Sequence, residues 1–169
     1  MKKVRFIFYS LLIMFVYISC TVSYSFTQGA VSRDIKTYSI YNFPNRARII
    51  NPTLSDYFAE QLKEKFTRQA GLDYQTDNGD LEFEGEIVGY DVQPMAIKSD
   101  DVASMNRLTV RIKVKFTNNK EHEQDFETEF SAYDEFSSDL ILSDAEEQLV
   151  ETIVKQIIED IYNKSVGNW

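Results

Sequence analysis

Residue types that could do chemistry are scarce in this sequence of 169 residues. It contains one cysteine, Cys20, and one histidine, His122, whereas acidic residues number 27. A structural zinc site takes about four ligands, and these two residues cannot supply them. His122 lies in the polar segment NNKEHEQ, where a solvated loop histidine is expected rather than a catalytic base. The sequence therefore predicts no metal site and no bound cofactor.

The many carboxylates could in principle provide the acid and the base of a hydrolase. Several of them, however, alternate with apolar residues, as Glu82, Glu84 and Glu86 do in DLEFEGEI. This alternation is typical of the solvated face of a strand. The sequence has no glycine-rich phosphate loop, since Gly85 and Gly89 lie inside a strand pattern and indicate a bulge or a close backbone approach. We therefore expect no enzyme activity.

Cys20 directly follows the end of an N-terminal signal-like segment. Three basic residues precede an apolar run over residues 6–18. This run is shorter than the roughly 20 residues of a membrane-spanning helix and suits a secretory signal peptide. The stretch also resembles a bacterial lipoprotein signal, which is cut in front of a cysteine that already carries diacylglycerol. The resemblance implies that residues 1–19 are removed and that Cys20 carries covalent diacylglycerol and a fatty acyl group. The alternative is a buried or incidental thiol, although the chain has no second cysteine.

Removal of residues 1–19 would leave 15 basic and 27 acidic residues, a net charge of −12. Such an acidic domain lacks the basic footprint of a nucleic-acid-binding protein. The remaining chain of about 150 residues is long enough for one domain with a hydrophobic core. Residues 20–34 are mostly small and polar, and we expect them to form the lipidated N-terminus and a tether. A single domain would then occupy residues 35–169.

Three strand-like segments in the middle of the chain alternate in charge as well as in hydrophobicity. Acidic residues alternate with apolar ones in 80–92 and 124–130, whereas basic residues do so in 107–117. Opposite charges directly across a strand pair contribute about 0.2–1 kcal/mol each, so the basic strand is expected between the two acidic ones. The result is an antiparallel meander with one apolar and one charged face. The connection over 98–106 is long for a hairpin loop.

Two amphipathic helices are predicted to cover the apolar face of this sheet. Asn51 and Pro52 open the first, which ends at Gly71. Its apolar residues are Leu54, Phe58, Leu62 and Phe66. The second helix is predicted to begin at the capping box SDAE, 143–146. With a further strand over 35–43, the fold class is α+β in the order β-α-β-β-β-α. Two helices would pack on one face of a four-stranded, largely antiparallel sheet.

Several blocks of the sequence resemble the LptE family of lipopolysaccharide-assembly lipoproteins, in the form found in Bacteroidetes-like bacteria. They are FPN at 43–45, NPTLSDYFAEQLKEKF at 51–66, DLEFEGEIVGYDVQPMAI at 80–97, NRLTVRIKVKFTN at 106–118 and the C-terminal NW. The resemblance implies an outer-membrane lipoprotein on the periplasmic face, held there by its lipid anchor. It also implies that the protein plugs and helps to assemble the β-barrel LptD, and that the two together insert lipopolysaccharide into the outer leaflet. The alternative is a periplasmic lipoprotein adaptor of another transport or secretion complex.

The candidate contact residues for lipopolysaccharide or for the barrel are the basic residues of segment 107–117. They are Arg107, Arg111, Lys113 and Lys115. Arginine and lysine suit phosphate oxygens, the first as a two-pronged donor and the second as a point charge. Two interpretations are open. Either these residues only neutralise the glutamates of neighbouring strands, or the centre of the row, Arg111 and Lys113, meets lipid A phosphates or the inner wall of the barrel.

Overall fold

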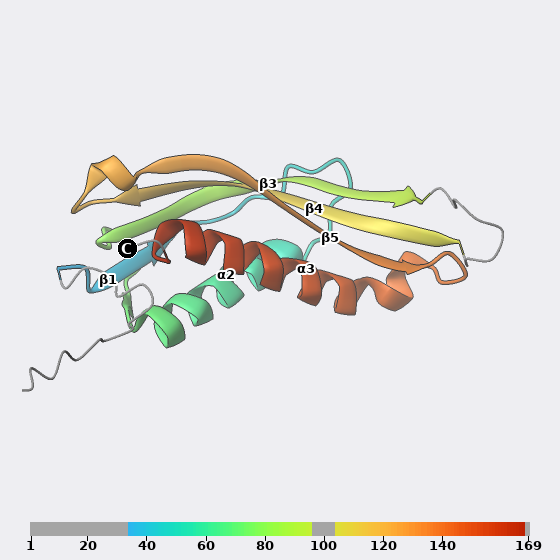
Figure 1. Ribbon diagram of the computed structural model, residues 1–169, viewed down its shortest axis with the longest axis horizontal. Coiled ribbons are helices and arrows are strands. Elements are labelled where there is room, and N and C mark those ends of the chain that lie inside the picture. The colour runs from blue at the N-terminus through green and yellow to red at the C-terminus, as the bar shows by residue number, and fades with distance from the viewer. Residues whose placement is uncertain (1–33, 96–103, 168–169) are drawn as a thin grey trace, which may run out of the picture.

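The computed structural model describes residues 34–95 and 104–167. Its elements are β1 (Thr37–Ile40), α2 (Leu54–Lys65), the π-helical turn η1 (Phe66–Ala70), β2 (Asp73–Tyr74), β3 (Leu81–Pro94), β4 (Met105–Asn118), the 3-10 turn η2 (His122–Gln124), β5 (Phe126–Ser137) and α3 (Leu142–Ser165). Both helices lie on one face of a long twisted sheet (Figure 1). The predicted α+β class is confirmed. The predicted signal peptide and nearly all of the tether lie outside the described residues.

The sheet has five strands rather than the predicted four, in the order β2-β1-β3-β4-β5. β1 pairs in parallel with β2 and β3, whereas β3 with β4 and β4 with β5 are antiparallel. The unpredicted strand β2 consists of Asp73 and Tyr74 alone, which is too short to show an alternating pattern. The parallel pairing arises because the helix α2 returns the chain to the same end of the sheet before β2 and β3 begin.

The meander of β3, β4 and β5 is the one that the charge pattern predicts, with the basic strand between the acidic ones. In β4 the apolar side chains from Leu108 to Phe116 alternate with outward-facing polar ones and are buried. A register shift between Ile87 and Gly89 interrupts the pairing of β3 with β4, which confirms the bulge expected near the glycines. The strands are longer than predicted, and Met105 and Asn106, expected in the loop, belong to β4. Positions 98–103 of that loop are outside the described residues.

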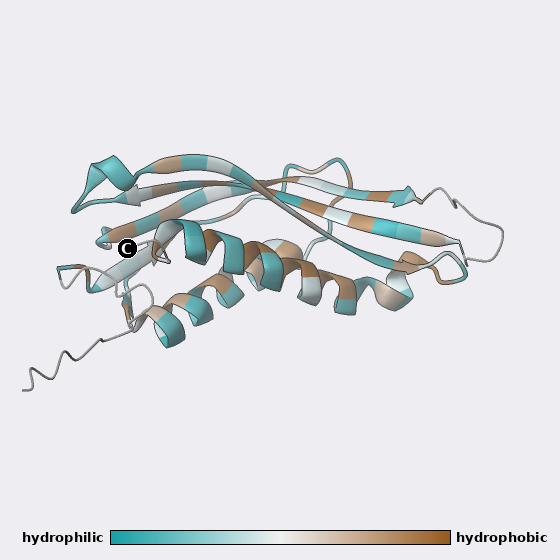
Figure 2. Ribbon diagram, in the orientation of Figure 1, coloured by the Kyte–Doolittle hydropathy of each residue, from teal (hydrophilic) through white to brown (hydrophobic). Residues whose placement is uncertain are grey.

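Both helices turn their predicted apolar stripes towards the sheet, as the hydropathy colouring of Figure 2 shows. In α2 the side chains of Leu54, Phe58 and Leu62 are fully buried, and Phe66 continues the stripe in η1. Gly71 has a φ of 67° and ends the helical segment as predicted. The buried residues of α3 are Leu149, Val150, Ile153, Val154, Ile157, Ile158, Ile161, Tyr162 and Ser165.

The starts of the two helices agree only partly with prediction. α2 begins at Leu54 with Thr53 as its N-cap residue, rather than at Pro52, but Asn51 still binds this end of the helix: its Oδ1 accepts hydrogen bonds from the backbone N–H groups of Thr53 at 3.0 Å and Leu54 at 3.1 Å. The prediction of a capping box at 143–146 is wrong, since α3 begins at Leu142 and its first turn has no side-chain cap. Glu146 instead accepts a hydrogen bond from the buried hydroxyl of Tyr90. A buried hydroxyl needs such a partner, and this need overrides the local capping preference.

Candidate functional site

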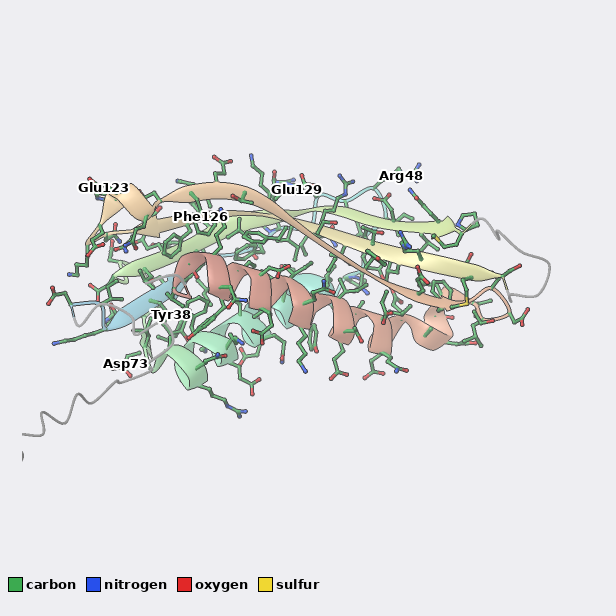
Figure 3. All side chains as sticks on the ribbon, in the orientation of Figure 1. Tyr38, Arg48, Asp73, Glu123, Phe126 and Glu129 are labelled. Carbon is green, nitrogen blue, oxygen red and sulfur yellow. The ribbon has the colours of Figure 1, made fainter. Side chains whose placement is uncertain are left out.

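The four basic residues singled out in the sequence lie in one row along β4. Alternate side chains of a strand point to opposite faces, and the apolar set of β4 is buried beneath the helices. Arg107, Arg111, Lys113 and Lys115 therefore point to the outer face of the sheet, away from α2 and α3. Glu129 of β5 lies on the same outer face (Figure 3). The structure thus brings together all four predicted residues.

Arg107 lies near one end of this row and is held by β5. Its Nη2 lies 2.6 Å from Oε1 of Glu135, and its Nε donates to the same oxygen at 3.1 Å. The guanidinium carbon also lies 3.9 Å from the centre of the Tyr133 ring. A planar guanidinium favours both contacts, the ion pair and the stacking on an aromatic ring.

Arg111 bridges both neighbouring strands. Its guanidinium lies 3.3 Å from Asp91 of β3 and 3.5 Å from Glu129 of β5. The side chain runs over Gly89, where an added Cβ would lie 2.5 Å from the Nε of Arg111. The glycine beside the bulge therefore provides the space in which this arginine crosses the sheet.

Each of the two lysines contacts a glutamate on a different neighbour. Lys113 Nζ lies 2.5 Å from Glu127 of β5, and Lys115 Nζ lies 2.5 Å from Glu84 of β3. The hydrogen bond with Glu127 raises the pKa of Lys113, and the same bond lowers the pKa of Glu127. The hydrogen bond with Glu84 likewise raises the pKa of Lys115. Both lysines are therefore positively charged throughout the neutral pH range.

Carboxylates outnumber basic groups on the outer face of β3, β4 and β5. They are Glu82, Glu84, Glu86, Asp91, Glu127, Glu129 and Glu135. The positive charge predicted for β4 is thus present in the strand but is neutralised across the sheet. A shallow hollow of about 260 Å³ lies over Gly85, between the two lysines and the glutamates beside them. The row therefore neutralises its neighbours, and because every pair is at the surface it also stays accessible to a partner.

A larger groove, of about 640 Å³, lies between the first turns of α2 and α3 and was not predicted. Its lining residues are Asn51, Thr53, Tyr57, Ser143, Glu146, Glu147, Val150 and Glu151. In this region Glu146 accepts hydrogen bonds from the hydroxyl of Tyr90 and, at 3.0 Å, from Asn51 Nδ2. Burial raises the pKa of Tyr90, and the hydrogen bond to Glu146 raises it further. These bonds join β3, α3 and the segment before α2, and no sequence pattern links the three residues.

Two further arginines, Arg46 and Arg48, lie in the segment between β1 and α2. Both are exposed, and within the described residues neither forms an ion pair. Arg48 lies towards the outer side of the sheet (Figure 3). The next two residues, Ile49 and Ile50, are 44% and 64% exposed. Sequence reasoning missed this cationic and apolar loop because it has no period.

The remaining candidates for chemistry are peripheral. His122 lies in η2, its side chain is 71% exposed, and its Nδ1 lies 3.1 Å from Asp125. In residues 34–95 and 104–167, no three acidic, histidine or cysteine side chains are grouped to hold a metal ion. No helix in this described part is long and apolar enough to cross a membrane. The predicted lipidation site, Cys20, lies outside the described residues.

Comparison with known families identifies the domain. A family model described as LptE, lipopolysaccharide-assembly, matches residues 35–165. The chain belongs to the LptE family. The resemblance seen in the sequence blocks is thereby confirmed, and the matched region of this LptE-family protein takes in every strand and both helices. No protein of curated function matches the sequence.

Several solved structures share the fold of this LptE-family protein. A minor lipoprotein from Acinetobacter baumannii is 13% identical, with a TM-score of 0.51 over 78% of this chain and 92% of the other. A hypothetical protein from Chlamydia trachomatis is 8% identical, with a TM-score of 0.53 over 79% and 99%. A protein from Xanthomonas campestris is 10% identical, with a TM-score of 0.50 over 80% and 84%. At such identities the likeness concerns the fold alone.

Proposed function

We propose that this LptE-family protein is an outer-membrane lipoprotein that plugs and helps to assemble the β-barrel LptD. Together the two proteins would insert lipopolysaccharide into the outer leaflet. The observation that carries the proposal is the lipopolysaccharide-assembly family match, which spans residues 35–165. The domain acts without catalysis, through its surfaces, and multiple acyl chains on Cys20 hold it at the periplasmic face of the outer membrane.

Co-purification from the native host tests this function. The affinity-tagged full-length protein is expressed, membranes are extracted in mild detergent, and the captured proteins are identified. We expect LptD as a stoichiometric partner, and depletion of the tagged protein should reduce both the assembled barrel and surface lipopolysaccharide. Capture of a soluble or inner-membrane complex in place of the barrel would instead support the adaptor function and overturn the proposal.

Within this function, we propose that the centre of the basic row, Arg111 and Lys113, contacts lipid A phosphates or the inner wall of the barrel, with Arg107 and Lys115 beside it. The row is accessible, since the side chains of Arg111 and Lys113 are 42% and 46% exposed. Exposed ion pairs contribute only about 0–1 kcal/mol, so an incoming phosphate could replace a glutamate at small cost. The bidentate geometry of arginine favours such an exchange.

Replacing both central residues by glutamine tests this contact. The folded Arg111→Gln/Lys113→Gln variant should lose binding of purified lipopolysaccharide or recover less barrel. Raised salt should likewise weaken the binding of lipopolysaccharide or barrel by the unmodified protein, because exposed charges are screened over about 10 Å at 0.1 M ionic strength. The control is Arg68→Gln/Lys155→Gln, which removes two charges from the helical side. If the central variant binds lipopolysaccharide and barrel as well as the control, the row only neutralises its neighbours.

A further inference from the structure

The sheet ends in a long open strand edge. β5 (Phe126–Ser137) pairs with β4 on one side, and no strand of the described chain lies on its other side. Exposed edge strands are usually protected by proline, charged side chains or a bulge, because their unpaired N–H and C=O groups form a template for another strand. The sequence FETEFSAYDEFS has neither proline nor lysine, and the register with β4 is uninterrupted. Its charged residues are all acidic, so the edge keeps a regular row of N–H and C=O groups but disfavours an acidic partner strand.

The hydrogen bonds at the end of the ladder determine which groups of β5 face outward. The N–H of Ser138 donates to the carbonyl oxygen of Ser104 at 2.9 Å, so these two residues form a hydrogen-bonded pair. Such pairs alternate with non-hydrogen-bonded ones along an antiparallel ladder. The even-numbered residues of β5 therefore bond to β4, and the odd-numbered residues direct N–H and C=O to the open edge, where the N–H of Glu135 already donates to Oδ1 of Asp134 at 2.8 Å. The bond from the N–H of Met95 to the oxygen of Met105 gives the matching phase between β3 and β4.

The same odd-numbered residues also point their side chains to the outer face of the sheet. They are Glu127, Glu129, Ser131, Tyr133 and Glu135. A strand added at this edge would form hydrogen-bonded pairs directly opposite these residues. Basic side chains at those positions would lie across from glutamates, as Lys115 lies across from Glu84 in the ladder between β4 and β3. The acidic, basic, acidic order of the sheet would then continue with a second basic strand.

We propose that the open edge of β5 binds, by β-augmentation, an extended segment of another protein in which basic residues alternate with apolar or neutral ones. Main-chain hydrogen bonds supply the binding energy, and the glutamates select the charge of the added strand. A second copy of β5 is disfavoured in the register that pairs the two strands over their full length. Antiparallel pairing of two copies about Ser131 would set Glu127 against Glu135, and like charges directly opposite are destabilising. The inference rests on the sheet edge alone and not on the proposed function.

Amide hydrogen exchange followed by NMR tests the geometry of the edge in the purified protein. In the free protein the amides of Glu127, Glu129, Ser131 and Tyr133 should exchange quickly and the even-numbered amides of β5 slowly. A capped synthetic peptide in which lysine or arginine alternates with valine or threonine serves as the probe. Binding at the edge should slow exchange at the odd-numbered amides selectively. Protection of other residues without these amides would overturn the proposal.

The geometry also specifies matched control peptides. Because the basic residues of the added strand form the hydrogen-bonded pairs, N-methylation at the basic positions should weaken binding at least about tenfold, whereas N-methylation at the intervening positions should be tolerated. A peptide with glutamate at every basic position should not bind. In the protein, Ser131→Pro removes an outward N–H and should weaken binding, whereas Ser131→Thr should not. Equal binding by the two N-methylated peptides, or no binding of the basic peptide at millimolar concentration, would overturn the proposal.

Discussion

Asp80 is the residue at which three strands are tied together. Its Oδ2 accepts hydrogen bonds from the backbone N–H groups of Lys36 at 2.9 Å and Thr37 at 3.0 Å, and from the Thr37 hydroxyl at 3.1 Å. Its Oδ1 lies 2.9 Å from Lys120 Nζ. Burial raises the pKa of this carboxyl, but the hydrogen bonds from Lys120, Lys36 and Thr37 outweigh it and lower the pKa to about 2. The charged form therefore stabilises the folded state.

Asp80→Asn should lower the free energy of unfolding at pH 7 by about 1.5–3 kcal/mol, the range for hydrogen bonds to a charged group. Since the folded-state pKa is depressed, the contribution of Asp80 is complete above the unfolded-state pKa of about 3.9. It is lost as the pH falls from there towards 2. Urea unfolding of both proteins between pH 7 and pH 2 measures the difference. A difference that stays constant over this range would show that the carboxylate charge is not responsible.

Gly85 lies where the structure has no space for a side chain. A Cβ at this position would lie 2.1 Å from the backbone oxygen of Lys113 and 2.8 Å from the ring of Phe43. Gly85→Ala should therefore destabilise the protein by about 3 kcal/mol, at the upper end of the overpacking range. Gly71→Ala is the control, because nothing lies within 4 Å of an added Cβ and only the positive φ is unfavourable, at about 1 kcal/mol. Thermal unfolding that ranked the two variants in the opposite order would contradict the close approach.

At the scale of elements, charge and hydropathy patterns predicted most of the fold. The charge pattern correctly predicted that the acidic strands β3 and β5 flank the basic strand β4, because side chains across a strand pair interact directly. The stripes of both helices followed from helical spacing. β2 was missed because two residues carry no pattern, and the start of α3 was misplaced because Glu146 serves a distant tyrosine. The site was half predicted for the same reason, since the basic row and the glutamates beside it are local patterns, whereas the loop at 46–50 and the bond between Tyr90 and Glu146 are tertiary features.

The docking of each helix can be tested separately. Phe58 of α2 and Ile157 of α3 are both fully buried, and Phe58 meets the ring of Phe43 at a centroid distance of 4.9 Å. Phe58→Ala and Ile157→Ala should each lower the free energy of unfolding by about 2–5 kcal/mol, through lost burial and the cavity left behind. Glu151→Ala is a control on the exposed side of α3 and should stay within about 0.5 kcal/mol. A buried variant that melted with the control would show that its helix does not pack as described.

At the scale of the whole molecule, the two faces of the sheet differ: one is buried under the helices and the other is exposed to solvent. The inner face, with both helices, buries the apolar side chains that hold the domain together, and it is packed without buried unsatisfied side-chain polar atoms in the described residues. The outer face, the open edge of β5 and the loop at 46–50 are not covered by the helices, and they carry the surfaces that we propose for partners. No described helix is long and apolar enough to cross a membrane. In the function that we propose, Cys20 carries the membrane anchor.

Cys20→Ala tests this role of Cys20. A single acyl chain binds a bilayer only marginally, whereas a multiply acylated cysteine would hold the domain without a spanning helix. We expect the variant to lose metabolic labelling with fatty acid and to appear as a soluble or unprocessed form in membrane fractionation. Its domain over residues 35–165 should still fold, so circular dichroism and the melting temperature of the purified variant provide the control. A variant that keeps both its fatty-acid label and its partitioning into detergent would assign Cys20 to an incidental thiol and place the anchor elsewhere in the chain.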